Sequence, residues 1–213
     1  MALNLPGGTT NDISFGPATV KMSLFGGTGA NPYGLTPTVD VGFIGDDGVS
    51  LEMVSEKKQI LQGNPRQVVY TFQQQQMVNV TFTSIEWDFG RFQMALGSGV
   101  VETPQSQYGE GASVPADFGV PSGATGDTFW FGGDPKNVDI AMSIRHQMGV
   151  TGDTLNCYIW KCQSTTGFTA PFGQDEHSFG FGFTSIGVTK SWDGIALSDH
   201  QSLIRMDRYT RIA

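Results

Sequence analysis

The side chains that could do chemistry in this chain are few and lack the spacing that chemistry needs. Histidine is the commonest general base and metal ligand, but His146, His177 and His200 stand neither four apart on a helical pattern nor two apart on a strand. His177 follows Asp175 and Glu176, yet three adjacent loop residues rarely converge on one reacting atom. We therefore expect no catalytic residues and no metal site.

Other catalytic signatures are also missing from the sequence. It holds no Gly-x-Ser-x-Gly nucleophile turn, no phosphate-binding Gly-x-x-x-x-Gly-Lys loop and no calcium-loop spacing. Glu86 and Asp88 resemble a carboxylate pair, but both fall in the first turn of an expected helix, where acidic groups interact favourably with the helix dipole. The sequence favours a protein that is not an enzyme and needs no cofactor.

The two cysteines, Cys157 and Cys162, lie five residues apart within one expected strand. An odd separation places two side chains on opposite faces of a strand, so these thiols should not form a disulfide with each other. No four-ligand zinc pattern surrounds them. We expect two reduced, structural cysteines.

Composition narrows the class of protein. The 213 residues fit one domain with a sizeable core, and 29 glycines between alternating apolar segments indicate a β-rich fold. Charged residues make up only 15% of the chain, against roughly 25% in an average soluble protein. Partners that cover part of the surface would explain this low charge, and so would a neutral, glycine-rich secreted domain. The net charge of −8 argues against a nucleic-acid-binding protein, because binding requires Lys and Arg side chains that contact the phosphates. It does not exclude a surface past which DNA slides, because like charge keeps a passing polyanion from sticking.

The sequence shows no pattern typical of a targeting signal or a membrane-spanning segment. The first ten residues lack a basic region followed by a long apolar run, so we expect no secretory signal. No segment reaches 18 uninterrupted apolar residues, so we expect no spanning helix and no membrane partner.

Period-two alternation predicts the strands that would form the body of the fold. Strands are expected at residues 13–24, 39–44, 49–54, 67–72, 78–82, 138–145, 155–162 and 179–184. The Asp47-Gly48 pair predicts a tight hairpin at residues 45–48, and the glutamines at 73–76 predict the turn of a second hairpin. Residues 196–209 fit either a strand or a short helix. We predict one domain, residues 1–213, with an all-β or β-rich fold: a β-sandwich or barrel with one flanking α-helix.

That helix is predicted at about residues 84–97. Thr83 and Glu86 have the spacing of a capping box, in which a hydroxyl precedes a carboxylate by three residues. An apolar stripe follows at intervals of four, three and four residues: Ile85, Phe89, Phe92 and Leu96. Gly97 supplies a stop.

Three segments lack the periodicity of a helix or a strand. Residues 1–12 are polar and glycine-rich, which predicts an arm that orders only against something else. Residues 102–128 form a long irregular insert. Residues 52–67 form a long hydrophilic connection that should project from the sheet. Its polar side chains are the candidate contacts between subunits or rings: Glu52, Glu56, Lys57, Lys58, Gln59 and Arg66.

Several patterns occur together over residues 39–100: Val39-Asp-Val-Gly-Phe-Ile44, the Gly48-Val-Ser-Leu strand, the polar arm, the hairpin, and the Thr83-Ser-Ile-Glu86 helix ending at Leu96-Gly97. This part of the chain resembles the tail tube proteins of long-tailed bacteriophages. Beyond residue 132 the likeness consists of strands in suitable number and of residues 179–189 followed by a Trp192-Asp-Gly194 turn.

The resemblance implies a β-sandwich or barrel beside a helix, with six copies closing into a ring. Rings would stack into a hollow tube through which genomic DNA leaves the capsid. It implies the virion tail as location, after assembly in the host cytoplasm. The implied partners are further copies, a terminator, a tape measure protein and baseplate or tip proteins, with viral DNA only as passing cargo. In this family the long loop between two strands reaches an adjacent subunit or ring, and the matching segment here is residues 52–67.

Other functions remain open at the level of sequence. A terminator of the tail would share the fold and form single rings, and a secretion-system tube would have a related architecture. A carbohydrate-binding β-sandwich is the alternative from another class, because aromatic faces stack on sugars. It would use the four tryptophans: Trp87, Trp130, Trp160 and Trp192.

Overall fold

A computed structural model describes residues 18–25, 37–86, 88–96, 100–102, 128–132, 138–148, 153–165 and 178–209. The strands are β1 (Ala18–Leu24), β2 (Val39–Asp40), β3 (Ile44–Gln62), β4 (Gln67–Ser84), β5 (Val100–Glu102), β6 (Thr128–Trp130), β7 (Ile140–Met148), β8 (Asp153–Ser164), β9 (Phe179–Ser185) and β10 (Ile204–Tyr209). The helices are α1 (Phe89–Leu96) and a short 3-10 helix, η3 (Asp199–Gln201). The arm predicted at residues 1–12, residues 103–127 of the insert, and the Asp175–His177 trio lie outside the described residues.

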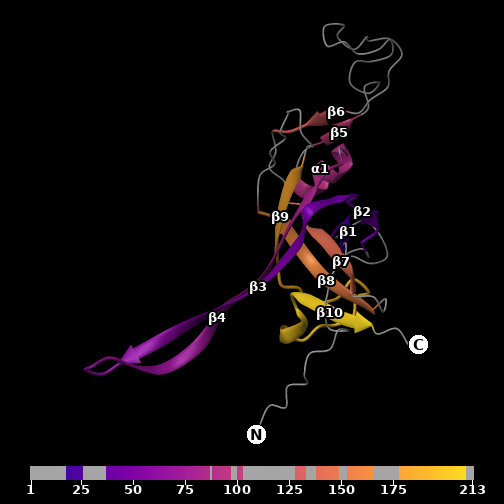
Figure 1. The fold of residues 1–213 in the computed structure, drawn as a ribbon. Coiled ribbons are helices and arrows are strands. Elements are labelled where there is room, and N and C mark those ends of the chain that lie inside the picture. Colours follow the sequence, from indigo (N-terminus) through magenta and orange to yellow (C-terminus); the bar gives the residue numbers. More distant parts are fainter. Residues whose placement is uncertain are drawn as a thin grey trace, which may run out of the picture.

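One antiparallel sheet of eight strands makes up most of the described fold (Figure 1). Its order is β2-β1-β7-β8-β9-β4-β3, and β10 pairs with β8 beside β9. The short strands β5 and β6 pair with each other and bracket the long insert. The predicted β-rich fold with one flanking helix is confirmed, and residues 204–209, left open by the sequence, form a strand.

The sheet curls around one main core, to which β1, β4, β7, β8, β9 and α1 all contribute buried apolar side chains. Phe92 of α1 is 1% exposed, and its ring lies 5.2 Å from that of Phe179 and 6.5 Å from that of Phe181. Offset and tilted aromatic pairs of this kind stabilise a core beyond the area they bury. The predicted apolar stripe thus places the helix against β9.

Helix α1 begins later than the capping-box pattern predicts. Residues 83 and 84 are the last of β4. Both pair with β9, and Ser84 also pairs with Ile44 of β3, so this pairing occupies the backbone that a helix would need. Asp88 caps the helix instead, because its Oδ1 accepts a hydrogen bond of 2.9 Å from the backbone N–H of Arg91. Glu86 lies outside the helix.

The structure has one long hairpin, β3–β4, where the sequence predicts two. Strand β4 runs without a break through the four glutamines at residues 73–76, and the chain turns at residues 63–66. The predicted hairpin at residues 45–48 is a bulge within β3, since Ile44 pairs with Ser84 and Val49 with Phe82, so that five steps along β3 span two along β4. Glycine at position 48, with φ of +68°, suits the bulge as well as a turn.

The two cysteines are on the same side of their strand, contrary to the prediction. Ile140 pairs with Cys162 and Met142 with Ile159, so β8 has one extra residue there, and this bulge reverses the alternation. Both cysteines are free and belong to the main core. Burial raises the pKa of Cys162 to about 12 and raises that of Cys157 above its ordinary value, so both are protonated thiols at neutral pH.

Candidate functional site

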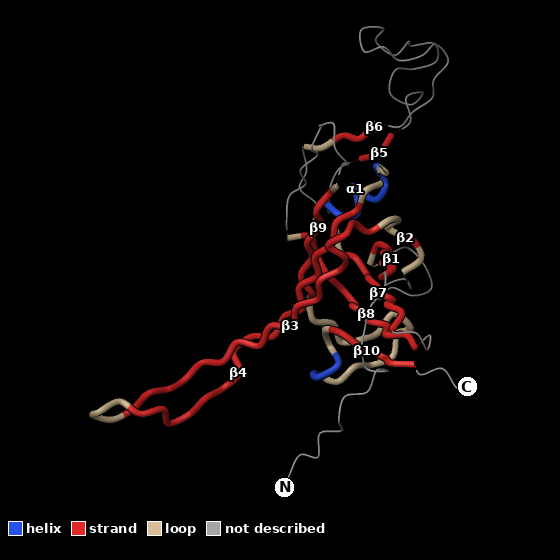
Figure 2. Tube along the Cα trace, viewed as in Figure 1, coloured by secondary structure: helices blue, strands red, loops and turns tan. Residues whose placement is uncertain are grey.

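The feature that departs most from a compact fold is the arm, residues 55–76, where the ends of β3 and β4 leave the body as a two-stranded ribbon (Figures 1 and 2). Every residue of the arm is exposed. Its eight β3 residues, 55–62, span on the order of 25 Å. The arm lacks the packing that supports the other strands, and a two-stranded ribbon alone is only marginally stable in water.

The predicted contact residues fall on two parts of this ribbon. Glu52 stays at its base, where its Oε2 accepts a hydrogen bond of 3.1 Å from the side-chain amide of Asn79. Five others lie on the arm: Glu56, Lys57, Lys58, Gln59 and Arg66. The predicted segment, residues 52–67, omitted the returning half of the arm.

The three cations of the arm have no partner within the described residues. Lys57, Lys58 and Arg66 form no ion pair there, and residues 57–76 contain no Asp or Glu. Because Glu56 also lies on the arm, the arm carries a net charge of +2, and since the whole chain carries −8, the rest of it carries −10. The arm is therefore a basic projection on a strongly acidic protein.

One face of the arm is apolar and exposed. Lys58 pairs with Phe72 and Ile60 with Tyr70, so these four side chains share a face. The rings of Tyr70 and Phe72 stack with centroids 6.3 Å apart. Tyr70 is 61% exposed and Ile60 49%. We call these four residues the apolar face of the arm.

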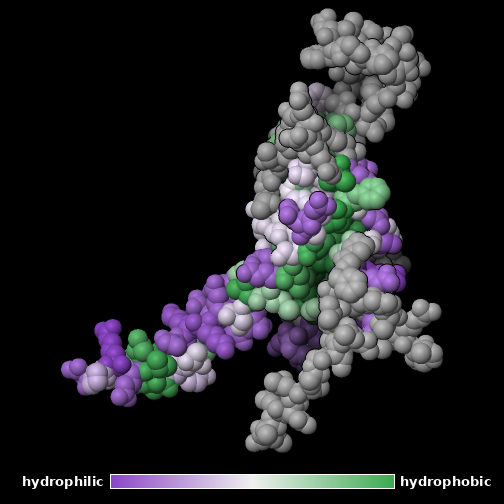
Figure 3. Space-filling model, viewed as in Figure 1, coloured by the Kyte–Doolittle hydropathy of each residue, from purple (hydrophilic) through white to green (hydrophobic). Residues whose placement is uncertain are grey.

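Further apolar side chains lie near the turn of the arm: Leu61, Val68 and Val69, all at least half exposed. Figure 3 shows a hydrophobic region close to the end of the projection. The alternation at Val68, Tyr70 and Phe72 was visible in the sequence, but periodicity does not tell whether an apolar face is buried by its own chain. Exposed apolar clusters rimmed by polar residues mark interaction surfaces.

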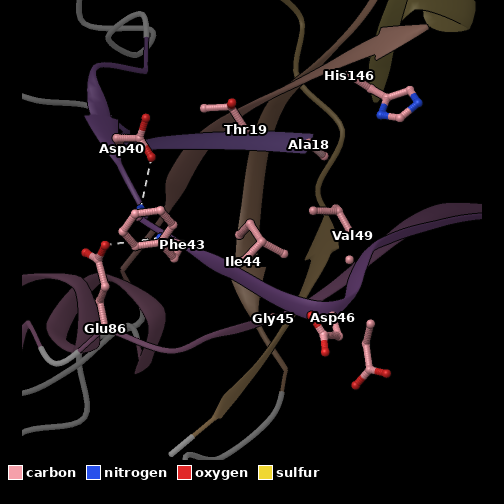
Figure 4. Close-up of a pocket in the computed structure, with 13 residues that line it drawn as sticks. Ala18, Thr19, Asp40, Phe43, Ile44, Gly45, Asp46, Val49, Glu86 and His146 are labelled. Carbon is pink, nitrogen blue, oxygen red and sulfur yellow. Dashed lines mark hydrogen bonds between the residues drawn. The ribbon is translucent and has the colours of Figure 1, made fainter. Parts of the chain in front are cut away.

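A hollow of about 790 Å³ lies at the opposite end of β3, between β1, β2, the bulge and Glu86 (Figure 4). Phe43 stands at its wall and is 70% exposed, more than any other large apolar side chain of the described residues. The backbone around Phe43 is held by two carboxylates. Asp40 Oδ1 accepts from Gly42 N–H at 2.9 Å, and Glu86 Oε1 accepts from Phe43 N–H at 3.3 Å.

The lining of the hollow is acidic. Its carboxylates are Asp40, Asp46, Asp47 and Glu86. Glu86 forms an ion pair with Arg91, whereas Asp40, Asp46 and Asp47 have no ion pair within the described part of the chain. Three carboxylates without an ion pair therefore lie around an exposed aromatic ring, although Lys21 is the cross-strand partner of Asp40.

Arg91 ties this region to the helix. Its guanidinium binds Glu86 and also donates to the carbonyl oxygen of Val41 at 3.2 Å. The hydrogen bond from Arg91 lowers the pKa of Glu86 below its ordinary 4.5 and outweighs the opposing effect of desolvation.

A pH dependence of stability follows from this ion pair. A carboxyl whose pKa is lower in the folded state stabilises the fold above its unfolded pKa, and the contribution is lost as pH falls through the folded value. The difference in melting temperature between the native chain and Glu86→Gln should be constant above about pH 6 and should shrink below 4.5. Thermal melts followed by circular dichroism across that range would measure it. A difference that does not change with pH would contradict the role of the Glu86 charge.

Gly42 is expected to be the most sensitive glycine of the hollow. Its φ is +84°, and an added Cβ would overlap the Glu86 carboxylate and the Arg91 guanidinium. Gly42→Ala should therefore destabilise the protein by more than the roughly 1 kcal/mol of backbone strain alone, because the Glu86–Arg91 ion pair must also move. Gly48→Ala is the matched control, because its φ is +68° but no atom lies within 4 Å of the added Cβ, and it should cost about 1 kcal/mol. If urea unfolding shows that both variants lose the same free energy of unfolding, the overlap with Glu86 and Arg91 has no effect on stability.

The other candidates of the sequence gain no support as chemical sites. The described residues hold no group of three His, Cys, Asp or Glu that could bind a metal ion. No helix among them is long and apolar enough to cross a membrane. Trp160 and Trp192 pack edge to face and are buried, so they are unavailable for stacking on a sugar, whereas Trp130 is exposed and Trp87 lies outside the described residues.

Comparison of the chain with models of known protein families and with curated proteins found no match. The arm, its apolar face and the acidic hollow are therefore the features that point to a function.

Proposed function

We propose that the protein is a structural subunit that assembles with copies of itself into a phage tail tube. In this proposal six copies close into a ring, and rings stack around a channel for DNA. The observation that carries it is the arm: 22 consecutive exposed residues with an apolar face that the chain itself leaves uncovered. The resemblance of residues 39–100 to tail tube proteins supplies the specific architecture.

The arm needs a partner on energetic grounds. Complete burial of a large apolar side chain contributes about 1.5–3 kcal/mol, so burying the exposed parts of Ile60, Tyr70 and Phe72 would contribute roughly 3–4 kcal/mol. Association costs about 4–15 kcal/mol in lost freedom of motion. One docked arm is therefore insufficient for a stable complex. A closed ring, in which every copy makes several contacts, meets this requirement.

The sheet offers a second surface for such contacts. Strand β3 ends the order of strands, so its outer edge carries unpaired backbone groups along the body. Natural proteins cover or pair an edge of this length. A neighbouring copy would do so in a ring.

The charge of the protein suits a channel for DNA. A surface of net negative charge repels a polyanion, which prevents the passing strand from adhering. The function needs no catalytic group and no cofactor.

Electron microscopy of the purified protein tests the proposal. Stacked rings or tubes are expected for a tube protein. Single rings that never stack would favour a tail terminator. Isolated monomers at high concentration, with tryptophan fluorescence that changes on adding glycans, would overturn the proposal in favour of a carbohydrate-binding module. Tubes encoded beside secretion genes would identify a secretion-system tube.

A further inference from the structure

We propose that the arm of one copy docks in the acidic hollow of the next, with the apolar face of the arm against Phe43. The inference rests on the proposed self-assembly and identifies the surface that receives the arm. The occupant of the hollow is a second copy of this chain.

The two surfaces match in apolar character. The arm presents Ile60, Tyr70 and Phe72 on one side of a ribbon, all partly or largely exposed. Phe43 stands in the wall of a hollow large enough to take side chains of this size. Figure 4 shows the Phe43 ring lying between Asp40 and Glu86, with Ile44 and Val49 further along the same wall. Docking would remove both aromatic surfaces from water.

The two surfaces also match in charge. The arm carries three cations without partners: Lys57, Lys58 and Arg66. The hollow carries three carboxylates without ion pairs: Asp40, Asp46 and Asp47. Lys58 belongs to the apolar face itself, so a carboxylate near Phe43 would lie beside it. Complementary charges of this kind set orientation and exclude wrong partners.

An arm does not reach the hollow of its own chain. The hollow includes Val49, and Lys58 lies nine residues further along the same strand, or about 30 Å away. The arm runs away from the body along that direction (Figure 1). Contact between the two surfaces therefore joins different copies.

Each copy then has one arm to donate and one hollow to receive. Such an interface is heterologous, because the two joined surfaces differ, and it closes into rings or extends without limit. Reversing the charges of one surface should therefore weaken assembly, and reversing both should restore it.

Two charge-reversed variants test this expectation. The arm variant carries Lys57→Glu, Lys58→Glu and Arg66→Glu, and the hollow variant carries Asp46→Lys and Asp47→Lys on the exposed bulge. Each alone should need a roughly hundredfold higher concentration to assemble, because like charges would then face each other. A 1:1 mixture of the two should assemble again near the native concentration, because the native arm meets the native hollow and the Glu-bearing arm meets the Lys-bearing hollow.

Combining all five substitutions in one chain should restore assembly, because the charges are again complementary. The control for the hollow variant carries Asp193→Lys and Asp199→Lys. It changes the net charge by the same amount as the hollow variant, but at exposed positions outside the hollow, and it should assemble like the native chain. Circular dichroism and the fluorescence of the buried Trp160–Trp192 pair would show that each variant is folded.

The outcomes separate this inference from the proposed function. If the arm variant fails to assemble while the hollow variant behaves like its control, the arm binds elsewhere and the docking inference is wrong, although self-assembly stands. If the five-fold variant stays monomeric while folded, charge pairing between these surfaces is refuted. If the native chain itself never assembles, the proposed function is wrong, and the docking inference that rests on it is wrong as well.

Discussion

A chain in which residues 56–75 are replaced by Asn-Gly is expected to fold normally and to remain monomeric. Ser55 and Gln76 pair directly across the hairpin, so a two-residue turn can join them without disturbing the strands of the body. The removed residues contain every exposed side chain of the apolar face. Assembly should require at least a hundredfold higher concentration, because several contacts are lost together.

Sedimentation velocity would measure the assembly of this shortened chain, and thermal unfolding would measure its stability. We expect the melting temperature to change little or to rise, since the arm is a ribbon without tertiary packing. Rings or tubes formed by the shortened chain at native concentrations would show that the arm has no part in assembly.

Two phenylalanines are expected to give opposite results when changed to alanine. Phe92 is 1% exposed and packs against Phe179, so Phe92→Ala should lower the free energy of unfolding by about 3–5 kcal/mol. Phe72 is 37% exposed on the arm, and among the aromatic rings of the described residues it stacks only on Tyr70. Phe72→Ala should cost the monomer less than about 1 kcal/mol and should instead weaken assembly by roughly tenfold.

Urea unfolding of the monomer and sedimentation of the assembled protein would separate these effects. The pair is well matched because the same atoms are removed from the same residue type. A loss of several kcal/mol for Phe72→Ala would mean that the arm packs on its own body. No loss for Phe92→Ala would mean that α1 does not close the core.

Strands with strict alternation were predictable from the sequence. Residues 138–145 and 179–184 alternate because one face of each strand contacts the core, and the structure has β7 and β9 there. The helix was predictable from its stripe, which includes Phe92, but its start was not. Residues 83 and 84 are bonded to neighbouring strands, and that tertiary pairing prevails over a local capping pattern.

The continuity of the long hairpin was not predictable. Both faces of the arm are exposed, so its strands need no alternation, and glutamines fit a strand there as well as a turn. The bulges at residues 45–48 and in β8 change the register without an unambiguous sequence signal, which is why the Asp47-Gly48 turn and the opposite faces of the cysteines were wrongly predicted.

The hollow could not be found from the sequence, because its residues come from separate segments. The curled sheet brings Asp40 of β2 and Asp46 of the bulge to one hollow with Glu86 and His146. The basic residues of the arm, by contrast, lie in one hydrophilic stretch of the sequence, which is why the sequence alone predicts Lys57, Lys58 and Arg66 as contacts.

The central claim is that the exposed arm is completed only by other copies of the chain. Sedimentation velocity of the native protein over a range of concentrations tests it most directly. We predict a species of ring size or larger that grows with concentration and disappears when residues 56–75 are removed. A single monomeric species up to the highest soluble concentration would contradict the account.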